Sequence, residues 1–157
     1  MDLSKIGIIG TSKKEDERRV PIHPEHLLRL PEHIRKKLIF EKGYGKPFHI
    51  EDDEIAKQTG GMATRSEILS DIGTAIIAKP ILSDFNELKE GGILWGYHHC
   101  AQQMNVTQAA IDRKLTLIAF EDMFVWSPNE QIGRHTFYKN NEMAGYCAVI
   151  HALQLKG

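Results

Sequence analysis

Short apolar runs recur along the chain and are separated by segments of mixed polarity. Five runs have the length and composition of buried strands: residues 5–9, 38–41, 74–78, 93–97 and 116–120. Because these runs are almost continuously apolar, they favour strands that are covered on both faces, as in a parallel sheet.

The segments between the runs carry helix signals. We expect helices at residues 25–30, 52–58, 66–69, 84–88, 106–113 and 141–155. The segment 52–58 begins with acidic residues and is followed by Gly60 and Gly61, as the helix dipole and a C-terminal glycine stop favour. In the last segment Asn140 or Asn141 is a candidate cap. Its apolar stripe consists of Met143, Cys147, Ile150 and Leu153.

Strands that alternate with helices predict an α/β fold with a doubly wound, mostly parallel sheet, of the flavodoxin-like or Rossmann-like type. The length of 157 residues suits a single domain, residues 1–157. In such folds ligands bind at the carboxyl ends of the strands. This rule directs attention to residues 10–19, Lys79, residues 98–100 and Glu121.

Composition excludes several classes of protein. The chain is 41% hydrophobic with a formal net charge of −1, so no global charge favours nucleic acid or an anionic membrane. No apolar run approaches the ~20 residues that span a bilayer, and the start lacks the features of a secretory signal. Cys100 and Cys147 make no disulfide framework, and reduced thiols indicate a cytoplasmic protein.

Common catalytic and nucleotide-binding motifs are missing from the sequence. Residues 7–10 do not make a G-x-G-x-x-G fingerprint, and neither do residues 43–48. A P-loop, a G-x-S-x-G elbow and an H-E-x-x-H zinc motif are also absent. We therefore expect neither a dinucleotide nor a metal to be bound by this chain.

The predicted strand ends deliver two cations, an imidazole and a carboxylate: Arg18 or Arg19, Lys79, His98 or His99, and Glu121. A guanidinium binds a carboxylate through two parallel hydrogen bonds. An ammonium polarises a keto oxygen, and a histidine exchanges protons near neutral pH. Together they suit a small keto acid as substrate.

Each of these residues also has a purely structural interpretation. The charged run 13–19 is typical of a solvated loop, and Lys79 with Pro80 would simply end a strand. One of the two adjacent histidines is expected to be a core residue, and Glu121 with Asp122 would cap a turn. Their coincidence at one predicted edge favours the functional interpretation.

Four segments resemble one enzyme family: residues 13–20 followed by Pro24, residues 75–80, residues 93–99 and residues 141–145. The chain is similar there to alanine dehydrogenases, lysine-forming saccharopine dehydrogenases and the transhydrogenase N-terminal domain. Within this family it most resembles the N5-(carboxyethyl)ornithine synthases, through residues 40–45, 120–123 and 134–142.

The resemblance implies roles for individual residues. It places the carboxylate-binding arginine at Arg19, with Arg18 as the alternative, the keto-oxygen lysine at Lys79 and the catalytic acid and base at His99. It further assigns contacts with the amino-acid substrate to Glu121 and Arg134. Alanine dehydrogenases carry a glutamate between the lysine and the proline, whereas here Lys79 directly precedes Pro80.

The family enzymes are roughly twice as long, so the resemblance implies an N-terminal substrate domain without its NAD(P)-binding domain. The implied reaction condenses pyruvate with an amine, ornithine in the most similar enzymes, at the expense of NADPH. Two alternatives stay open: an alanine dehydrogenase, which uses ammonia, and a stand-alone ligand-binding domain without catalysis. The apolar stripe of the last helix predicts a homo-oligomer.

Overall fold

The computed structural model describes residues 5–129 and 131–156, which form two compact units. The first unit ends at Ala119 and the second begins at Phe120. The assignment of residues 1–157 to one substrate-binding domain stays a prediction, so each unit is described by itself.

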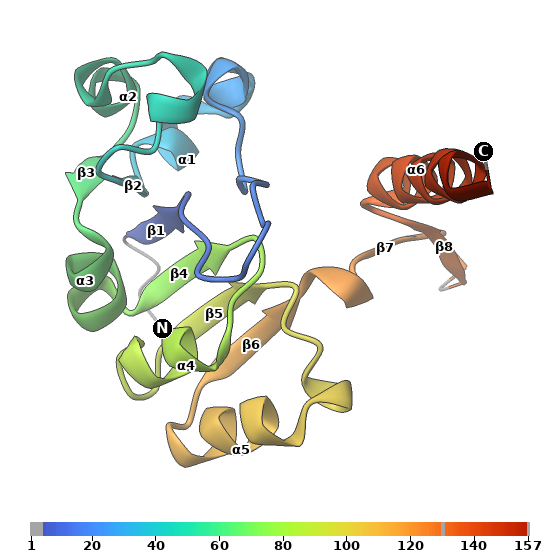
Figure 1. Cartoon of the computed structure of the whole chain (residues 1–157). Helices are drawn as coiled ribbons and strands as arrows, with labels where there is room; N and C mark the ends of the chain where they lie inside the picture. The colour runs from blue at the N-terminus through green and yellow to red at the C-terminus, as the bar shows by residue number, and fades with distance from the viewer. Residues whose placement is uncertain (1–4, 130, 157) are drawn as a thin grey trace. The chain divides into compact units, whose positions relative to one another are not determined.

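A six-stranded sheet forms the centre of the first unit (Figure 1). Its strand order is β3-β2-β1-β4-β5-β6, and every neighbouring pair is parallel. The strands are β1 (Ile6–Ile9), β2 (Leu38–Glu41), β3 (Gly61–Ala63), β4 (Thr74–Ile77), β5 (Ile93–Gly96) and β6 (Thr116–Ala119). This confirms the predicted parallel α/β fold. The sequence pattern missed β3, because three residues behind two glycines carry too little apolar periodicity.

Helices and single turns connect the strands. The helices are α1 (Glu32–Arg35), α2 (Asp52–Gln58), α3 (Arg65–Glu67), α4 (Leu82–Glu87) and α5 (Met104–Asp112). The turns are η1 (Pro24–Arg29), η2 (Lys46–Phe48), η3 (Ile68–Ile72) and η4 (Cys100–Gln102). Side chains fix two of the starts. Thr64 and Glu67 form a capping box on α3, and the Asp84 carboxylate accepts the Ile81 N–H at α4.

The sheet is covered on both faces, as a doubly wound fold requires. Adjacent residues of β1 point to opposite faces. Ile9 joins the core with Phe85 of α4 and Val106 of α5, whereas Ile8 joins the core with Leu27 of η1 and Ile55 of α2. The near-continuous apolar character of the strands follows from this double coverage.

The chain reverses its direction of strand addition between β1 and β4. Strands β2 and β3 are added on one side of β1, and the chain then returns to add β4, β5 and β6 on the other. Open α/β sheets bind ligands at the carboxyl ends of the strands beside such a switch point. The loops after β1, β4 and β5 are therefore the place to look for a site.

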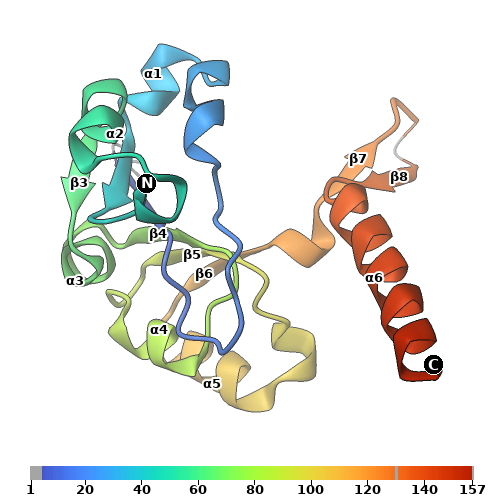
Figure 2. The same cartoon turned by 45° about the horizontal axis from the view of Figure 1, so that its top comes forward.

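The second unit consists of a hairpin and a long helix, which Figure 2 shows in sequence. Turn η5 (Phe120–Asp122) leads into the antiparallel strands β7 (Phe124–Trp126) and β8 (Ile132–His135), followed by α6 (Tyr138–Lys156). The expectation that Asn140 or Asn141 caps this helix was wrong. Their own N–H groups already donate to the Phe137 carbonyl, so both lie within the first turn.

Large apolar side chains of α6 are exposed within this unit. They are 57–75% exposed: Met143, Tyr146, Val149, Ile150, Leu153 and Leu155. The apolar surface is thus broader than the predicted stripe, and a helix that is apolar on many sides is typical of a buried position. No helix in the described part of the chain is long and apolar enough to cross a membrane.

Candidate functional site

The loop after β1 carries an arginine held by a neighbouring glutamate. The Arg19 guanidinium donates to Glu17 from Nε, at 2.9 Å to Oε1, and from Nη2, at 2.6 Å to Oε2. The Arg19 backbone N–H also donates to Glu17 Oε1, at 2.9 Å. The Glu17 side chain is only 7% exposed, against 47% for Arg19. The glutamate therefore fixes the plane of the guanidinium, while much of Arg19 faces solvent.

Charge reinforces this pair. The Arg19 hydrogen bond holds the pKa of Glu17 below its ordinary value, and the Lys79 charge acts in the same direction. The same contact with Glu17 raises the pKa of Arg19. Glu17 is consequently ionised at neutral pH. The influence of Lys79 on Glu17 also means that the loops after β1 and β4 bring their cations to the same carboxylate.

Aromatic contacts extend the group to the loop after β5. The Arg19 Cζ atom lies 5.4 Å from the centre of the Tyr97 ring, within the range of a cation–π interaction. The Tyr97 ring in turn stacks on the His99 ring, with centroids 6.3 Å apart. Arg18 is exposed, so Arg19 is the member of the arginine pair that meets Glu17 and Tyr97.

Backbone contacts bring the three loops to one edge. The Lys79 carbonyl accepts a hydrogen bond from Ser12 Oγ at 3.1 Å, and the Tyr97 N–H donates to the Ala78 carbonyl at 3.2 Å. Gly96 allows the approach of β5 to β4, because a Cβ atom there would lie 2.1 Å from the Ile77 carbonyl oxygen. Three predicted residues, Arg19, Lys79 and His99, thus lie on adjoining loops at the carboxyl ends of β1, β4 and β5.

The two adjacent histidines differ in environment. His98 is 2% exposed and meets the Phe85 ring edge-on at 6.2 Å, as expected for the core histidine. His99 is partly exposed and adopts the left-handed conformation, with φ 50° and ψ 42°. A non-glycine residue held there costs about 1–3 kcal/mol and is a pointer to function. His99 is therefore the histidine that can meet a ligand.

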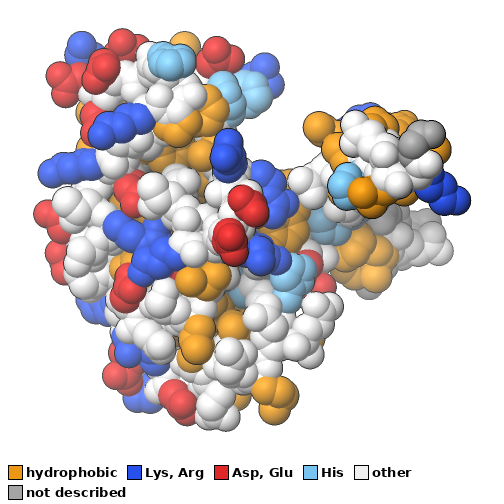
Figure 3. Space-filling model, viewed as in Figure 1, with side chains coloured by type: hydrophobic (Ala, Val, Ile, Leu, Met, Phe, Trp, Pro, Cys, Tyr) orange, Lys and Arg blue, Asp and Glu red, His pale blue; other side chains and the backbone are white. Residues whose placement is uncertain are grey.

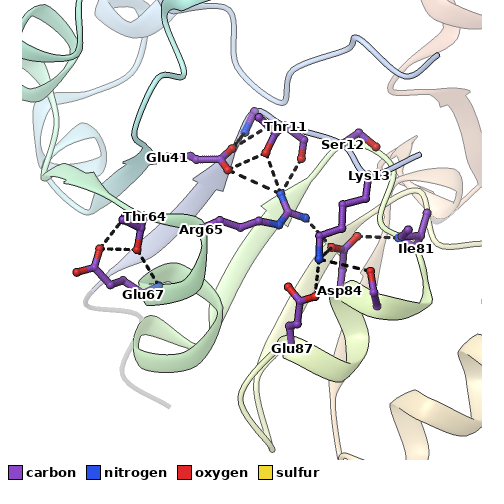
Figure 4. Close-up of polar contacts among 12 residues, drawn as sticks. Thr11, Ser12, Lys13, Glu41, Thr64, Arg65, Glu67, Ile81, Asp84 and Glu87 are labelled. Atoms are coloured by element: carbon purple, nitrogen blue, oxygen red, sulfur yellow. Dashed lines mark hydrogen bonds and ion pairs between the residues drawn. The ribbon is translucent and has the colours of Figure 1, made fainter. Parts of the chain in front are cut away.

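The sequence analysis missed a network of charged residues at the switch point (Figure 4). Arg65 lies 3.9 Å from Glu41 Oε1 and donates to Asp84 Oδ1 at 2.5 Å. Lys13 pairs with Asp84 at 3.8 Å and more closely with Glu87. Glu41 is 6% exposed and Asp84 fully buried. Charged residues at the end of a strand and at the start of a helix were available signals. Figure 3 shows Lys and Arg side chains directly beside Asp and Glu on the face in view.

This network occupies the position at which dinucleotide-binding folds hold a pyrophosphate. Glu41 Oε2 accepts the Gly10 and Thr11 N–H groups, both at 2.9 Å. The glycine that would admit a phosphate is covered, because a Cβ atom on Gly10 would lie 2.7 Å from the Tyr44 ring. A carboxylate and an aromatic ring thus fill the phosphate cradle, and the residues here do not fit a dinucleotide. Within the described residues no His, Cys, Asp and Glu cluster could hold a metal ion.

Glu121 and Arg134, the two predicted contacts with an amino acid, belong to the second unit. His135 Nε2 lies 3.2 Å from the Glu121 carbonyl oxygen. The exposed Arg134 places its Cζ atom 4.4 Å from the centre of the Tyr138 ring. Arg134, Tyr138 and Trp126 are among the residues that line a hollow of about 480 Å³. Within this unit the structure provides a cation beside aromatic rings.

The chain matches known proteins over most of its length. The sequence profile of the family described as "Alanine dehydrogenase/PNT, N-terminal domain" matches residues 8–131. An N(5)-(carboxyethyl)ornithine synthase of Lactococcus lactis subsp. lactis is 27% identical over 158 aligned residues, covering 95% of this chain and 50% of that protein. An alanine dehydrogenase of Methanococcus maripaludis is 36% identical over 120 residues, covering 73% of this chain and 31% of that protein. The chain thus spans half or less of these relatives.

Solved structures have the same fold. An L-alanine dehydrogenase superposes with a TM-score of 0.63 at 20% identity, over 81% of this chain and 34% of that one. A transhydrogenase from Sinorhizobium meliloti superposes with a TM-score of 0.62 at 20% identity, over 75% and 34%. The family profile covers the sheet and the three loops described above, and the relatives named by sequence are oxidoreductases. The chain therefore belongs to the alanine dehydrogenase/PNT N-terminal domain family.

Proposed function

We propose that this chain is the substrate-binding part of an NAD(P)H-dependent oxidoreductase that condenses a 2-keto acid, pyruvate, with an amine. The proposal is carried by one observation: Arg19, Lys79 and His99 lie on adjoining loops at the carboxyl edge of the sheet, linked through Glu17 and Tyr97. A guanidinium, an ammonium and an imidazole match the three groups that change or bear charge on a keto acid during this reaction.

Arg19 binds the carboxylate of the keto acid in this proposal. Glu17 accepts from the Nε and Nη2 edge of the guanidinium. A planar guanidinium presents a second pair of donors at its Nη1 and Nη2 edge, which is where the substrate carboxylate would bind. Glu17 then orients the arginine, and Tyr97 supports it from below the guanidinium plane.

Lys79 and His99 act on the carbonyl group. Lys79 donates a hydrogen bond to the keto oxygen and stabilises the negative charge that develops as the amine attacks. His99 transfers a proton to the departing hydroxyl, so that water leaves and an imine forms. Both roles depend on holding the substrate in register, which the carboxylate contact with Arg19 provides.

The cofactor of the proposed enzyme, NADP or NAD, supplies the hydride for reduction of the imine. The switch point of this chain is filled by Glu41 and Tyr44 and does not fit a dinucleotide. We therefore assign cofactor binding to the length of the family enzymes that this chain does not match, and no reaction step of these residues runs through it.

Two substrates for the amine side have support. The similarity to N(5)-(carboxyethyl)ornithine synthase extends over 95% of the chain, including the second unit with Glu121 and Arg134. This favours an amino acid such as ornithine, with those two residues as its contacts. The higher identity, 36%, to an alanine dehydrogenase favours ammonia instead. Reduction of pyruvate by the complete enzyme with ornithine or with ammonium distinguishes the two. Absence of turnover with both leaves a non-catalytic ligand-binding domain.

Replacing Arg19 tests the carboxylate contact. We expect Arg19→Lys to raise the KM for the keto acid at least tenfold in the complete enzyme, because lysine cannot form two parallel bonds in one plane. Arg18→Lys is the matched control, since Arg18 is exposed. A keto-acid KM within twofold of the unsubstituted enzyme would assign the carboxylate to another residue.

Replacing His99 tests the proton transfer. We expect His99→Asn to lower kcat by ~10²–10⁴, the usual range for a lost acid or base. His98→Asn is an unsuitable control because His98 is buried, so an exposed histidine away from these loops, His33, is used instead. Unchanged turnover in the His99 variant would remove this residue from the chemistry.

A further inference from the structure

Arg65 joins two loops that are far apart in the sequence. Its Nη1 atom donates to the Thr11 carbonyl at 2.7 Å and lies 3.1 Å from Thr11 Oγ1. Its Nη2 atom donates to Asp84 Oδ1 at 2.5 Å. Thr11 begins the loop after β1, and Asp84 lies in α4, which follows the loop after β4. One guanidinium therefore spans the switch point, as Figure 4 shows.

Both partners of Arg65 are themselves fixed. Glu41 holds Thr11 through the Thr11 N–H at 2.9 Å and the Thr11 Oγ1 hydroxyl at 2.7 Å. The second oxygen of Asp84 accepts the Ile81 N–H at 2.8 Å and so caps α4. Arg65 is 16% exposed at its side chain, and Asp84 is fully buried. A buried charge is retained only where it is paired, so Asp84 needs the arginine.

From these two anchors, short contacts lead to the proposed substrate residues. Ser12, next to Thr11, donates to the Lys79 carbonyl and accepts the Lys14 N–H at 3.1 Å. The Lys14 carbonyl accepts the Glu17 N–H at 3.3 Å, and Glu17 holds Arg19. Asp84 reaches Lys79 through the start of α4, only five residues along the chain.

We propose that Arg65 is a positioning residue, which sets the loop that carries Arg19 and the loop that carries Lys79 at the separation that one keto acid requires. This inference rests on the proposed function. The ladder between β1 and β4 aligns the two strands without Arg65. The loops beyond the strands have no such ladder, and Arg65 supplies the bonds between them. An arginine suits this position because its planar fork reaches two acceptors at once, whereas a lysine presents a single ammonium.

The test uses a double variant, Arg65→Met with Asp84→Asn, which breaks the link without leaving a buried unpaired carboxylate. The asparagine retains a carbonyl oxygen for the Ile81 N–H. A second variant, Arg65→Lys, keeps the charge beside Asp84 but cannot bond both loops. Arg35→Met is the matched control. Arg35 also bonds two backbone carbonyls, those of Leu30 and Gln58, but near the amino ends of β2 and β3.

Two measurements are made on the ¹⁵N-labelled chain by NMR. The first is the position of the Arg19 Nε–H signal, which reports the bond to Glu17 and needs no ligand. The second is the Kd for pyruvate from a titration. We expect both Arg65 variants to shift or broaden the Arg19 signal and to weaken pyruvate binding about tenfold or more. Arg35→Met should change neither, even where it lowers Tm by the same amount.

An Arg19 signal and a pyruvate Kd within twofold of the unsubstituted chain in the double variant would overturn the inference. If the unsubstituted chain fails to bind pyruvate, the proposed function is wrong instead. In that case the Arg19 signal alone decides: a shift in the Arg65 variants and not in Arg35→Met supports the link between the loops, and an unmoved signal refutes it.

Discussion

Glu41→Gln is the sharpest test of the network at the switch point. The carboxylate of Glu41 is 6% exposed. Its Oε2 atom accepts two backbone N–H groups at 2.9 Å, and its Oε1 atom accepts the Thr11 hydroxyl at 2.7 Å. Glutamine has the same size and retains one oxygen for the two N–H groups. The substitution therefore removes the charge and leaves the packing in place.

The expected loss follows from these bonds. A hydrogen bond to a charged group contributes about 1.5–3 kcal/mol, whereas a neutral one contributes about 0.5–1.5 kcal/mol. Each of the two backbone bonds thus loses about 1 kcal/mol. The amide NH₂ would also take the position that now faces Arg65 at 3.9 Å, where a carboxylate is favourable. We expect the free energy of unfolding to fall by about 2–3 kcal/mol in total.

The assay must report on the first unit alone. The sequence has two tryptophans: Trp95 in β5 and Trp126 in the hairpin of the second unit. In a Trp126→Phe background, fluorescence during urea denaturation at pH 7 follows Trp95 and therefore the sheet. Glu90→Gln is the control, because the pair of Glu90 with Lys114 is exposed and surface pairs contribute little.

A loss in Glu41→Gln no larger than that in Glu90→Gln would refute this reasoning. It would mean that the three hydrogen bonds of Glu41 do not depend on its charge. A changed slope of unfolding against urea would instead indicate that the variant had altered the compactness of one state, and the comparison would then use midpoints at matched slopes.

Three further outcomes are expected. Because the pKa of Glu17 is lowered by Arg19, the stability from this pair is present at neutral pH and lost as the pH falls through that lowered value; the difference in unfolding free energy between the unsubstituted chain and Glu17→Gln should therefore shrink below pH 4.5, and an equal difference at pH 7 and pH 3 would contradict the pairing. Calorimetry should detect no saturable binding of NADPH to this chain, and a tight isotherm would contradict the interpretation of the switch point. The exposed apolar surface of α6 should produce a homodimer by light scattering, whereas a monodisperse monomer at high concentration would refute this expectation.

The sequence alone determined the sheet. Strands such as 38–41 and helices such as 52–58 were predicted with the bounds that the structure has, because apolar runs with acidic starts and glycine stops are local signals. The strand-end rule then selected Lys79 and His99 before any coordinates were known. The adjacent histidines were also divided as expected, into a core residue and a partly exposed one.

Only the tertiary structure decided which groups meet. The bond of Arg19 to Glu17 spans two residues, but its contact with Tyr97 spans 78, and no local pattern specifies such a pair. The same holds for Arg65, which looked like the start of a minor helix and instead links Thr11 to Asp84 across the switch point. Local signals fix the backbone because hydrogen bonding and burial repeat along it, whereas the encounter of single side chains depends on strand order and on the few ångströms between loops.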